Sequence, residues 1–291
     1  MIAQYIFDKL IGSNQSKSIV SKFYQLIRQQ ILSSSDPVVN YLYKGKNLAI
    51  HLSHDFPFIL KDYPQYSQNL GWVIGKFYQK YAGLKVIDVG ANIGDSVFII
   101  KDVADVPILC IEGNAKFLGL LKLNTQQLNQ VYTAACFVGE ESFKVEAISG
   151  LGTAHLKQSS SGGVEVKTME SVLLDNPTFK NAKLLKIDTD GFDNKIIRGS
   201  KSFLLESKAA IFFEYDPYFL TIQSENGDDI FDFLVSLNYK KFVIFDNVGD
   251  KLITLSHQDK NQFMELHNYF NRGSKRYMDI LAVHETDESL V

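Results

Sequence analysis

The stretch Lys85-Val86-Ile87-Asp88-Val89-Gly90-Ala91-Asn92-Ile93-Gly94-Asp95-Ser96-Val97-Phe98 decides the fold of this chain. Its first residues are apolar around one acid, which predicts a short buried strand. Gly90 and Gly94 then permit a sharp turn and a close backbone approach, and from Asp95 onward the apolar spacing is helical. A strand that enters a helix through a glycine loop is where open parallel sheets bind nucleotide-like ligands.

The glycine loop itself restricts the ligand. A dinucleotide site has the pattern G-x-G-x-x-G, whereas this chain carries Asn92 at the second glycine position and Asp95 at the third. Asp88 and Asp95 would also repel a pyrophosphate, at roughly 1–4 kcal/mol for each like-charge pair 4 Å apart. No Gly-Lys-Ser/Thr follows, so a P-loop is excluded. Unless it is an ordinary turn that binds nothing, the loop favours an adenosine ligand with positive charge and no phosphate, which describes S-adenosylmethionine (SAM).

A second acid supports this interpretation. Residues 107–112 predict the next buried strand, and Glu112 ends it 24 residues after Asp88. An acid about 20 residues further on, at the end of the second strand, binds the ribose hydroxyls in nucleotide-binding α/β sheets. The adenine ring is expected beside the end of the third strand. The residues predicted to bind SAM are Asp88, Gly90, Ala91, Asn92, Gly94, Glu112, Gly113 and Ala135.

The order of elements predicts the fold class. Strands expected at residues 85–89, 107–112, 131–138, 184–187 and 209–215 alternate with helices, which is typical of an α/β, doubly wound Rossmann-like sheet that is mostly parallel. Residues 241–255 predict an antiparallel edge hairpin, and residues 277–284 a last strand. Residues 149–163, rich in glycine and serine, predict a loop. We expect residues 1–66 to form an extension with a helix at 16–32 and a hairpin at 38–52, and residues 67–291 to form the main domain.

Composition narrows the class of protein. The chain has 291 residues, of which 45% are apolar and 22% charged, so a packed core is expected. The net charge is −3 and no long basic run occurs, which argues against a nucleic-acid partner. Cys110 and Cys136 lie in apolar runs and are expected to be reduced, buried thiols of a cytoplasmic protein. We expect neither a signal peptide nor a transmembrane segment; a homodimer is left open.

The stretch from Leu184 to Asp193 places acids after the fourth core strand. In an open α/β sheet this strand end faces the same crevice as Gly90. Asp188 is the first choice for a general base or for binding the acceptor, with Asp190 as a second catalytic candidate. These acids could instead hold Mg²⁺ through oxygen ligands, the less favoured alternative, or cap the following helix, the preferred interpretation for Asp193.

Three other residues complete the candidate acceptor site. His155, within the glycine- and serine-rich stretch, could close over the acceptor as a base, although a solvated histidine is equally compatible with the sequence. Glu214 and Tyr215 end the fifth core strand and could bind the acceptor. The alternative for Tyr215 is a place in the core, where such aromatic residues are more common.

Taken together, these motifs resemble the FkbM family of SAM-dependent methyltransferases. The resemblance is carried by residues 87–94, by Ile111-Glu112, by residues 185–193 and by Asp279-Ile280-Leu281, and it extends roughly from residue 84 to residue 284. The family pattern has Glu where this chain has Asp190 and Asp193, which shortens the reach of both acids. The resemblance implies a seven-stranded Rossmann-like methyltransferase sheet and O-methylation of a hydroxyl on a sugar, a polysaccharide or a glycosylated natural product.

Two other function classes compete with this one. A catalytically silent SAM-fold module could bind a partner in a polysaccharide-assembly complex, although the glycine loop, Glu112 and Asp188 are all intact. A dinucleotide oxidoreductase would have to bind NAD, which Asn92 and Asp95 disfavour.

Overall fold

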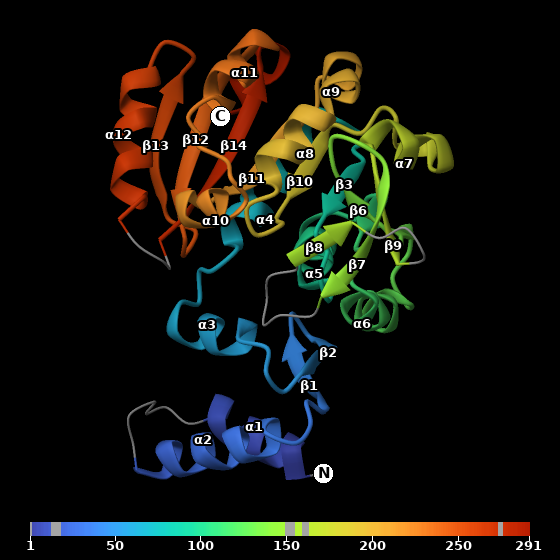
Figure 1. The fold of residues 1–291 in the computed structure, drawn as a ribbon, viewed down its shortest axis with the longest axis vertical. Coiled ribbons are helices and arrows are strands. Elements are labelled where there is room, and N and C mark those ends of the chain that lie inside the picture. Colours follow the sequence, from blue (N-terminus) through green and yellow to red (C-terminus); the bar gives the residue numbers. More distant parts are fainter. Residues whose placement is uncertain (1, 13–18, 149–154, 159–162, 273–275) are drawn as a thin grey trace.

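The computed structural model describes residues 2–12, 19–148, 155–158, 163–272 and 276–291 (Figure 1). Its centre is an eight-stranded sheet with the strand order β13-β12-β14-β11-β10-β3-β4-β5. The strands are β3 (Val86–Val89), β4 (Ile108–Ile111), β5 (Val131–Ala134), β10 (Leu184–Ile187), β11 (Ala210–Tyr215), β12 (Tyr239–Asp246), β13 (Lys251–Ser256) and β14 (Met278–His284).

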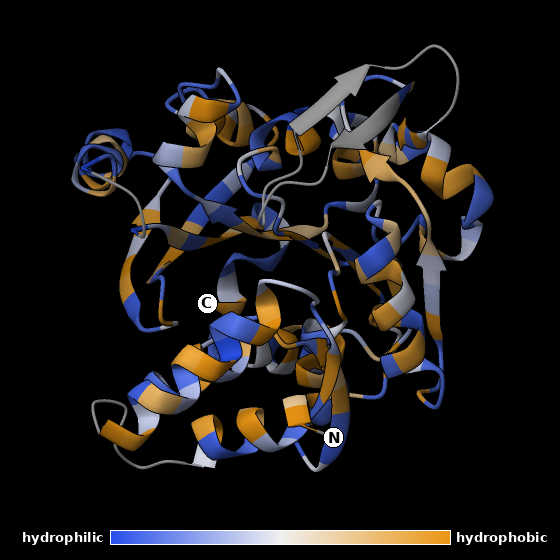
Figure 2. Ribbon diagram, turned by 60° about the horizontal axis from the view of Figure 1, so that its bottom comes forward, coloured by the Kyte–Doolittle hydropathy of each residue, from blue (hydrophilic) through white to orange (hydrophobic). Residues whose placement is uncertain are grey.

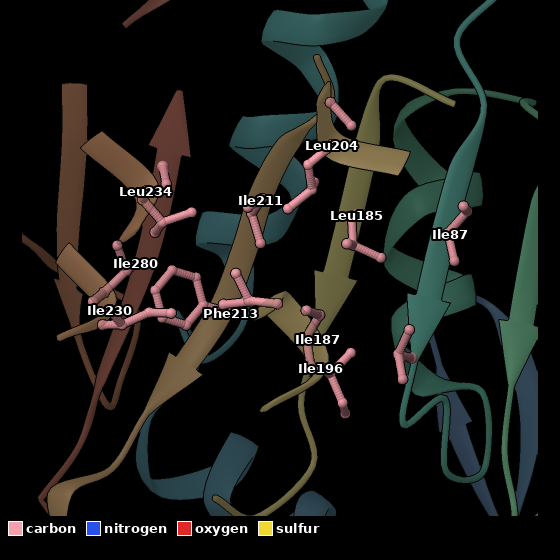
Figure 3. Close-up of a cluster of buried hydrophobic side chains, with 14 of the residues drawn as sticks. Ile87, Leu185, Ile187, Ile196, Leu204, Ile211, Phe213, Ile230, Leu234 and Ile280 are labelled. Atoms are coloured by element: carbon pink, nitrogen blue, oxygen red, sulfur yellow. The ribbon is translucent and has the colours of Figure 1, made fainter. Parts of the chain in front are cut away.

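The strand directions confirm a mostly parallel sheet with an antiparallel edge hairpin. The strands from β11 to β5 run parallel, whereas β14 is antiparallel to both β11 and β12. Figure 3 shows the reversal, since the strand of Ile280 points opposite to those of Ile87, Leu185 and Ile211. The sheet has eight strands and not seven, because β13 pairs with β12 beyond the reversed strand.

The neighbours β3 and β10 form the switch point of the sheet. From β3 the chain continues to β4 and β5 on one side, and it returns to β10 and β11 on the other. Ligands of open α/β sheets bind outside the carboxyl ends of the strands at such a point. The glycine loop after β3 and the acidic stretch after β10 therefore meet there.

Helices cover both faces of the sheet, and strand alternation divides the core between them. Ile87 and Val89 pack in one buried cluster (Figure 3), whereas Val86 packs in a second cluster with α4 and α5. The helices of the main part are α4 (Gln68–Lys80), α5 (Asp95–Val103), α6 (Ala115–Thr125), α7 (Met169–Asp175), α8 (Asp193–Gly199), α9 (Lys201–Ser207), α10 (Pro217–Ile222), α11 (Ile230–Ser236) and α12 (Lys260–Phe270), with 3₁₀ turns η1 (Pro177–Phe179) and η2 (Glu285–Leu290).

The N-terminal residues form the predicted helix and hairpin, together with two further helices. The elements are α1 (Ile2–Gly12), α2 (Ile19–Leu32), β1 (Val38–Tyr43), β2 (Lys46–His51) and α3 (Phe56–Asp62). In Figure 1 they lie on the side toward which the arrowhead of β3 points. Phe7, Leu48 and Phe56 belong to the same buried cluster as Val97 and Phe98 of α5, so the extension packs on the main part. The division at residue 66 remains a proposal.

The helices α1 and α2 contain many hydrophobic residues (Figure 2), and several of these side chains are exposed. The exposed ones are Ile2, Tyr5, Ile19, Val20, Phe23 and Leu26. Among the described residues, no helix is long and apolar enough to span a bilayer.

Two predictions about the middle of the chain are wrong. Residues 131–138 are not one strand, because the chain leaves the main sheet after β5 and its β6 (Phe137–Val138) joins a second sheet of order β6-β9-β7-β8. That sheet contains β7 (Phe143–Ile148), β8 (His155–Gln158) and β9 (Val164–Lys167). The predicted loop at residues 149–163 thus contains a strand, β8, which pairs with β7; residues 149–154 and 159–162 lie outside the described part.

Candidate functional site

The glycine loop is held tightly between two strands. Gly90 has a φ of +75°, and a Cβ atom built there would lie 1.9 Å from the main-chain oxygen of Asp188. The main-chain nitrogens of Gly90 and Ala91 both donate to the oxygen of Ile111, at 3.0 and 3.2 Å. Gly94 also has a positive φ, +89°, and it is the N-cap of α5. Position 90 therefore requires glycine because the main chain of Asp188, directly after β10, leaves no room for a side chain.

Glu112 fastens this loop to the next helix. Its Oε2 accepts from the main-chain nitrogen of Asn92 at 2.9 Å, and its Oε1 accepts from that of Asn114 at 2.7 Å. The side chain is 7% exposed, and this burial raises its pKa to about 7. A carboxylate has about four lone-pair sites, so two hydrogen bonds leave acceptor capacity for a ligand hydroxyl.

The other predicted cofactor residues lie along the same strand ends. Gly113 is buried, and a Cβ there would come within 2.5 Å of the Phe137 ring. Ala135 is exposed directly after β5, next to Ala134, whose oxygen accepts from the nitrogen of Glu112 at 3.1 Å. The Oδ1 atom of Asn92 is buried, and it has no hydrogen-bond partner in the part of the chain that the structure describes.

Asp88 corrects one step of the sequence argument. It is fully buried, and its two carboxylate oxygens accept from Lys186 Nζ at 3.0 Å and from Ser96 Oγ at 2.5 Å. Its charge is therefore balanced by Lys186, so of the two acids of the glycine-loop stretch only Asp95 has no partner of opposite charge at hydrogen-bond distance among the described residues. Because it is fully buried and its charge is compensated by Lys186, Asp88 holds β3 and the loop in place and exposes no carboxylate oxygen to a ligand.

Lys186 is a site residue that the sequence interpretation did not single out. It lies opposite Asp88 in the β3–β10 pairing and is 7% exposed. Burial opposes its charge, but Asp88 and Asp188 outweigh burial and raise the pKa of Lys186. A lysine is almost never fully buried without a partner, so a lysine within the buried run Leu-Leu-Lys-Ile could have indicated this ion pair.

The acids after β10 lie beside the loop, at the carboxyl ends of the strands. Asp188 is exposed, with its Oδ2 3.4 Å from Lys186 Nζ. Asp190 is partly buried with a φ of +50°, and burial, followed by the charge of Asp188, raises its pKa to about 7. Asp95 lies at the start of α5. Burial raises its pKa to about 6; the charges of Asp188 and Asp88 act in the same direction, and that of Lys186 opposes them. These residues thus form an acidic cluster at the strand ends, with Lys186 as the cation beside Asp188.

Asp193 is the first residue of α8, but the N-cap position is Phe192 and no side chain caps the helix there, so the structure does not show the expected capping role. Asp193 is 1% exposed; its Oδ2 accepts from Thr189 Oγ1 at 2.9 Å, and its Oδ1 is buried without a partner among the described residues. Burial raises its pKa to about 7. This acid therefore fixes the turn after β10 through Thr189.

Glu214 and Tyr215 point to opposite faces of β11. Glu214 is paired with Asp279 of β14, and burial, then the charge of Asp188, raises the pKa of Glu214 well above its usual range. Tyr215 is fully buried in the core, with its hydroxyl 2.8 Å from His267 Nδ1. The prediction that Tyr215 contacts the acceptor is wrong, because successive side chains of a strand face opposite ways.

Residues distant in sequence, from α4 and β14 and next to them, complete the acidic cluster. Asn69, in the first turn of α4, donates from Nδ2 to Asp279 Oδ2 at 2.7 Å, and burial raises the pKa of Asp279 to about 7. The hydroxyls of Tyr66 and Tyr277 lie 3.4 Å apart. Except for the motif that contains Asp279, no local pattern in the sequence marked these residues.

Two predictions remain without a structural counterpart. The backbone of His155 pairs with Ile148 at the start of β8, and its side chain lies outside the described residues. Within the described residues, no group of three or more His, Cys, Asp or Glu side chains is arranged to hold a metal ion. Asp188 and Asp190 therefore have no third ligand of these types there.

The raised carboxyl pKa values predict how stability depends on pH. Glu112, Asp190, Asp193 and Asp279, each with a pKa of about 7, retain protons in the folded state, whereas the unfolded chain releases them near pH 4. The folded state therefore binds more protons between these values, and the free energy of unfolding falls as pH rises toward 7. We expect the apparent Tm to decrease from about pH 6.5 to pH 8 and then to level off.

The control separates these acids from the rest of the chain. Asp279→Asn should flatten this slope, because Asp279 no longer titrates, whereas Asp62→Asn on the exposed end of α3 should leave it unchanged. The window begins at pH 6.5 because buried histidines of lowered pKa act in the opposite direction below that value. A Tm that rises through this window in thermal scans would contradict the prediction.

Comparison with known proteins gives one family match. Residues 88–241 match the model of the family described as the methyltransferase FkbM domain. A comparison with curated proteins found no match.

The solved structures similar to this chain include three that illustrate the likeness. The methyltransferase FkbM from Methylobacillus flagellatus KT is 18% identical over 48% of this chain and 37% of its own, with a TM-score of 0.35; this chain thus spans well under half of that protein. The precorrin-6y C5,15-methyltransferase from Geobacter metallireducens GS-15 is 14% identical over 69% and 80%, with a TM-score of 0.37. The O-methyltransferase from Bacillus cereus, in complex with SAH, is 11% identical over 89% and 97%, with a TM-score of 0.45.

Proposed function

Because this chain belongs to the FkbM family of SAM-dependent methyltransferases, we propose that it methylates a hydroxyl group on a sugar, a polysaccharide or a glycosylated natural product. The observation that carries this proposal is the placement of Glu112 and Asp188. Glu112 closes the glycine loop on one side of the switch point, and the exposed Asp188 lies across it at the end of β10.

The strand ends fit SAM as their ligand. The buried Oδ1 of Asn92 can accept a hydrogen bond from an ammonium group, and the remaining lone pairs of Glu112 can accept from ribose hydroxyls. The exposed Ala135 can lie against an adenine ring at the end of β5. When bound, SAM supplies a methyl group on a sulfonium, which an acceptor oxygen can attack in line.

The chain's own residues then position the acceptor and its proton. Asp188 is exposed at the switch point and can take the proton of the acceptor hydroxyl, as a general base does. Lys186 holds one oxygen of Asp188 at 3.4 Å and so orients the carboxylate. Asp190, whose pKa of about 7 leaves it partly protonated near pH 7, can donate a hydrogen bond to an acceptor oxygen, and burial likewise raises the pKa of Glu214 and favours its protonated form. Much of the rate in such a reaction comes from this alignment.

Asp188→Asn should therefore separate transfer from cofactor binding. We expect methyl transfer to fall by about 100-fold or more, within the usual contribution of a general base, while affinity for S-adenosylhomocysteine (SAH) stays within about 3-fold. The assay uses SAM with a radiolabelled methyl group and the polysaccharide of the producing cells, with Asp62→Asn as the control.

Equal transfer by wild type and Asp188→Asn would exclude Asp188 as the base. A wild type that binds SAH but methylates no acceptor would favour the silent binding module over the enzyme.

We also propose a cytoplasmic location, because Cys110 and Cys136 are both buried free thiols.

A further inference from the structure

A cavity lies between the N-terminal extension and the main domain, outside the strand ends assigned above. It has a volume of about 400 Å³, and its lining includes Tyr43, Lys44, Leu60, Tyr66, Gly71 and Val103. The walls come from the β1–β2 hairpin and the segment between α3 and α4, and the floor comes from α4 and α5. Ligand sites occur preferentially at such junctions.

The cavity runs along part of α5, the helix that begins at the glycine loop. Ile99 and Val103 line it, and they lie four and eight residues after Asp95, on the same face of the helix. Asp95 begins α5 at the glycine loop, so the line from Asp95 to Val103 is about 12 Å long at 1.5 Å per residue. On α5 the cavity thus begins at Ile99, about one turn after Asp95, and ends at the exposed Val103.

Tyr66 lies between the cavity and the acidic cluster at the strand ends. Its side chain lines the cavity, and its hydroxyl lies 3.4 Å from that of Tyr277, which precedes the strand of Asp279. The rings of Tyr66 and Tyr43 are fixed by Phe56, with centroid distances of 6.3 and 5.1 Å. The charge of Asp188 also contributes, after burial, to the raised pKa of Tyr66, which places the two groups within electrostatic reach.

We propose that this cavity, which we call the α5 groove, binds the part of a saccharide acceptor that extends beyond the methylated ring. The inference rests on the proposed function and adds that the acceptor is a chain of linked sugars rather than a single one. Tyrosine rings give flat apolar faces to stack on sugar rings. Ser67 and Gln68 add polar groups for hydroxyls along the same groove, and Lys44, which is paired with Asp102 at 2.7 Å, has further N–H groups to donate.

Two glycines of α4 provide a matched test. A Cβ at Gly71 would sit 3.6 Å from Ile99 and Val103, so it fits, and the rest of a leucine side chain would occupy the groove. Gly75 lies one turn further along, with Val103 at 3.8 Å, and does not line the groove. We expect Gly71→Leu to raise the KM for the intact cell polysaccharide at least 10-fold and Gly75→Leu to change it less than 2-fold, with SAH affinity unchanged in both.

The acceptor itself gives a second readout. Wild type should methylate intact polysaccharide at a lower KM than its monosaccharide hydrolysate, and Gly71→Leu should lose this difference. Val103→Trp, at the exposed outer end of the groove, repeats the test should Gly71→Leu fail to bind SAH. Equal KM values for Gly71→Leu, Val103→Trp and Gly75→Leu would overturn the groove. No transfer by a wild type that binds SAH would instead overturn the proposed function and the groove with it.

Discussion

Gly90→Ala should weaken cofactor binding more than alanine at any of the other described glycines, because its Cβ would make the shortest contact among them. The new Cβ would lie 1.9 Å from the main-chain oxygen of Asp188 and 2.9 Å from its carbon, and it would sit on a residue with a φ of +75°. Both obstacles are backbone, so no side-chain rotation can relieve them. We expect the loop to separate from β10 and the affinity for SAH to fall by about 100-fold or more, which corresponds to about 2.7 kcal/mol.

The control for this substitution is Gly75→Ala. Gly75 is within α4, and its Cβ would meet only Val103 at 3.8 Å, an ordinary contact. Alanine is favoured over glycine in a helix by about 1 kcal/mol, so this variant should be as stable as wild type or slightly more so and should bind SAH normally. Calorimetric titration with SAH measures both variants, and wild-type affinity in Gly90→Ala would show that the loop geometry is wrong.

Lys186→Met should be the most destabilising single substitution of a charged residue in the site. It removes the cation 3.0 Å from the fully buried Asp88 and leaves that carboxylate with Ser96. Loss of one partner of a buried ion pair typically costs 3–5 kcal/mol, because the remaining charge is buried without compensation. We expect a loss of about that size in the free energy of unfolding, measured by urea denaturation.

A double-mutant cycle distinguishes the ion pair from simple loss of packing. Asp88→Asn combined with Lys186→Met removes both charges and should recover part of the stability that Lys186→Met loses. Lys180→Met, at an exposed position after η1, should change stability by less than about 0.5 kcal/mol. Additive effects in the cycle would mean that Asp88 and Lys186 do not interact energetically.

The local parts of the fold could be predicted from the sequence because their signals are local. The strand before Gly90, the β1–β2 hairpin and the C-terminal hairpin all have periodicity and turn residues within a few positions of each other. The position of β14 between β11 and β12 depends on pairing between strands far apart in the chain. The split of residues 131–138 between two sheets has the same cause, since β6 leaves β5 to pair with β9.

The site shows the same division. Glu112 could be predicted because its distance from Asp88 reflects one βαβ unit. The pairing of Asp88 with Lys186 depends on the strand register between residues 98 positions apart, so a carboxylate that looked free is compensated. Tyr215 was misplaced for a simpler reason, because residues adjacent on a strand face opposite sides and only Glu214 lies beside Asp279.

The most direct test is a calorimetric titration of the wild-type protein with SAH and, separately, with NAD. The account predicts saturable binding of one SAH per chain and no heat with NAD, since Asn92 and Asp95 replace the glycines that a pyrophosphate requires. Binding of NAD without binding of SAH would contradict the assignment of the glycine loop and everything built on it.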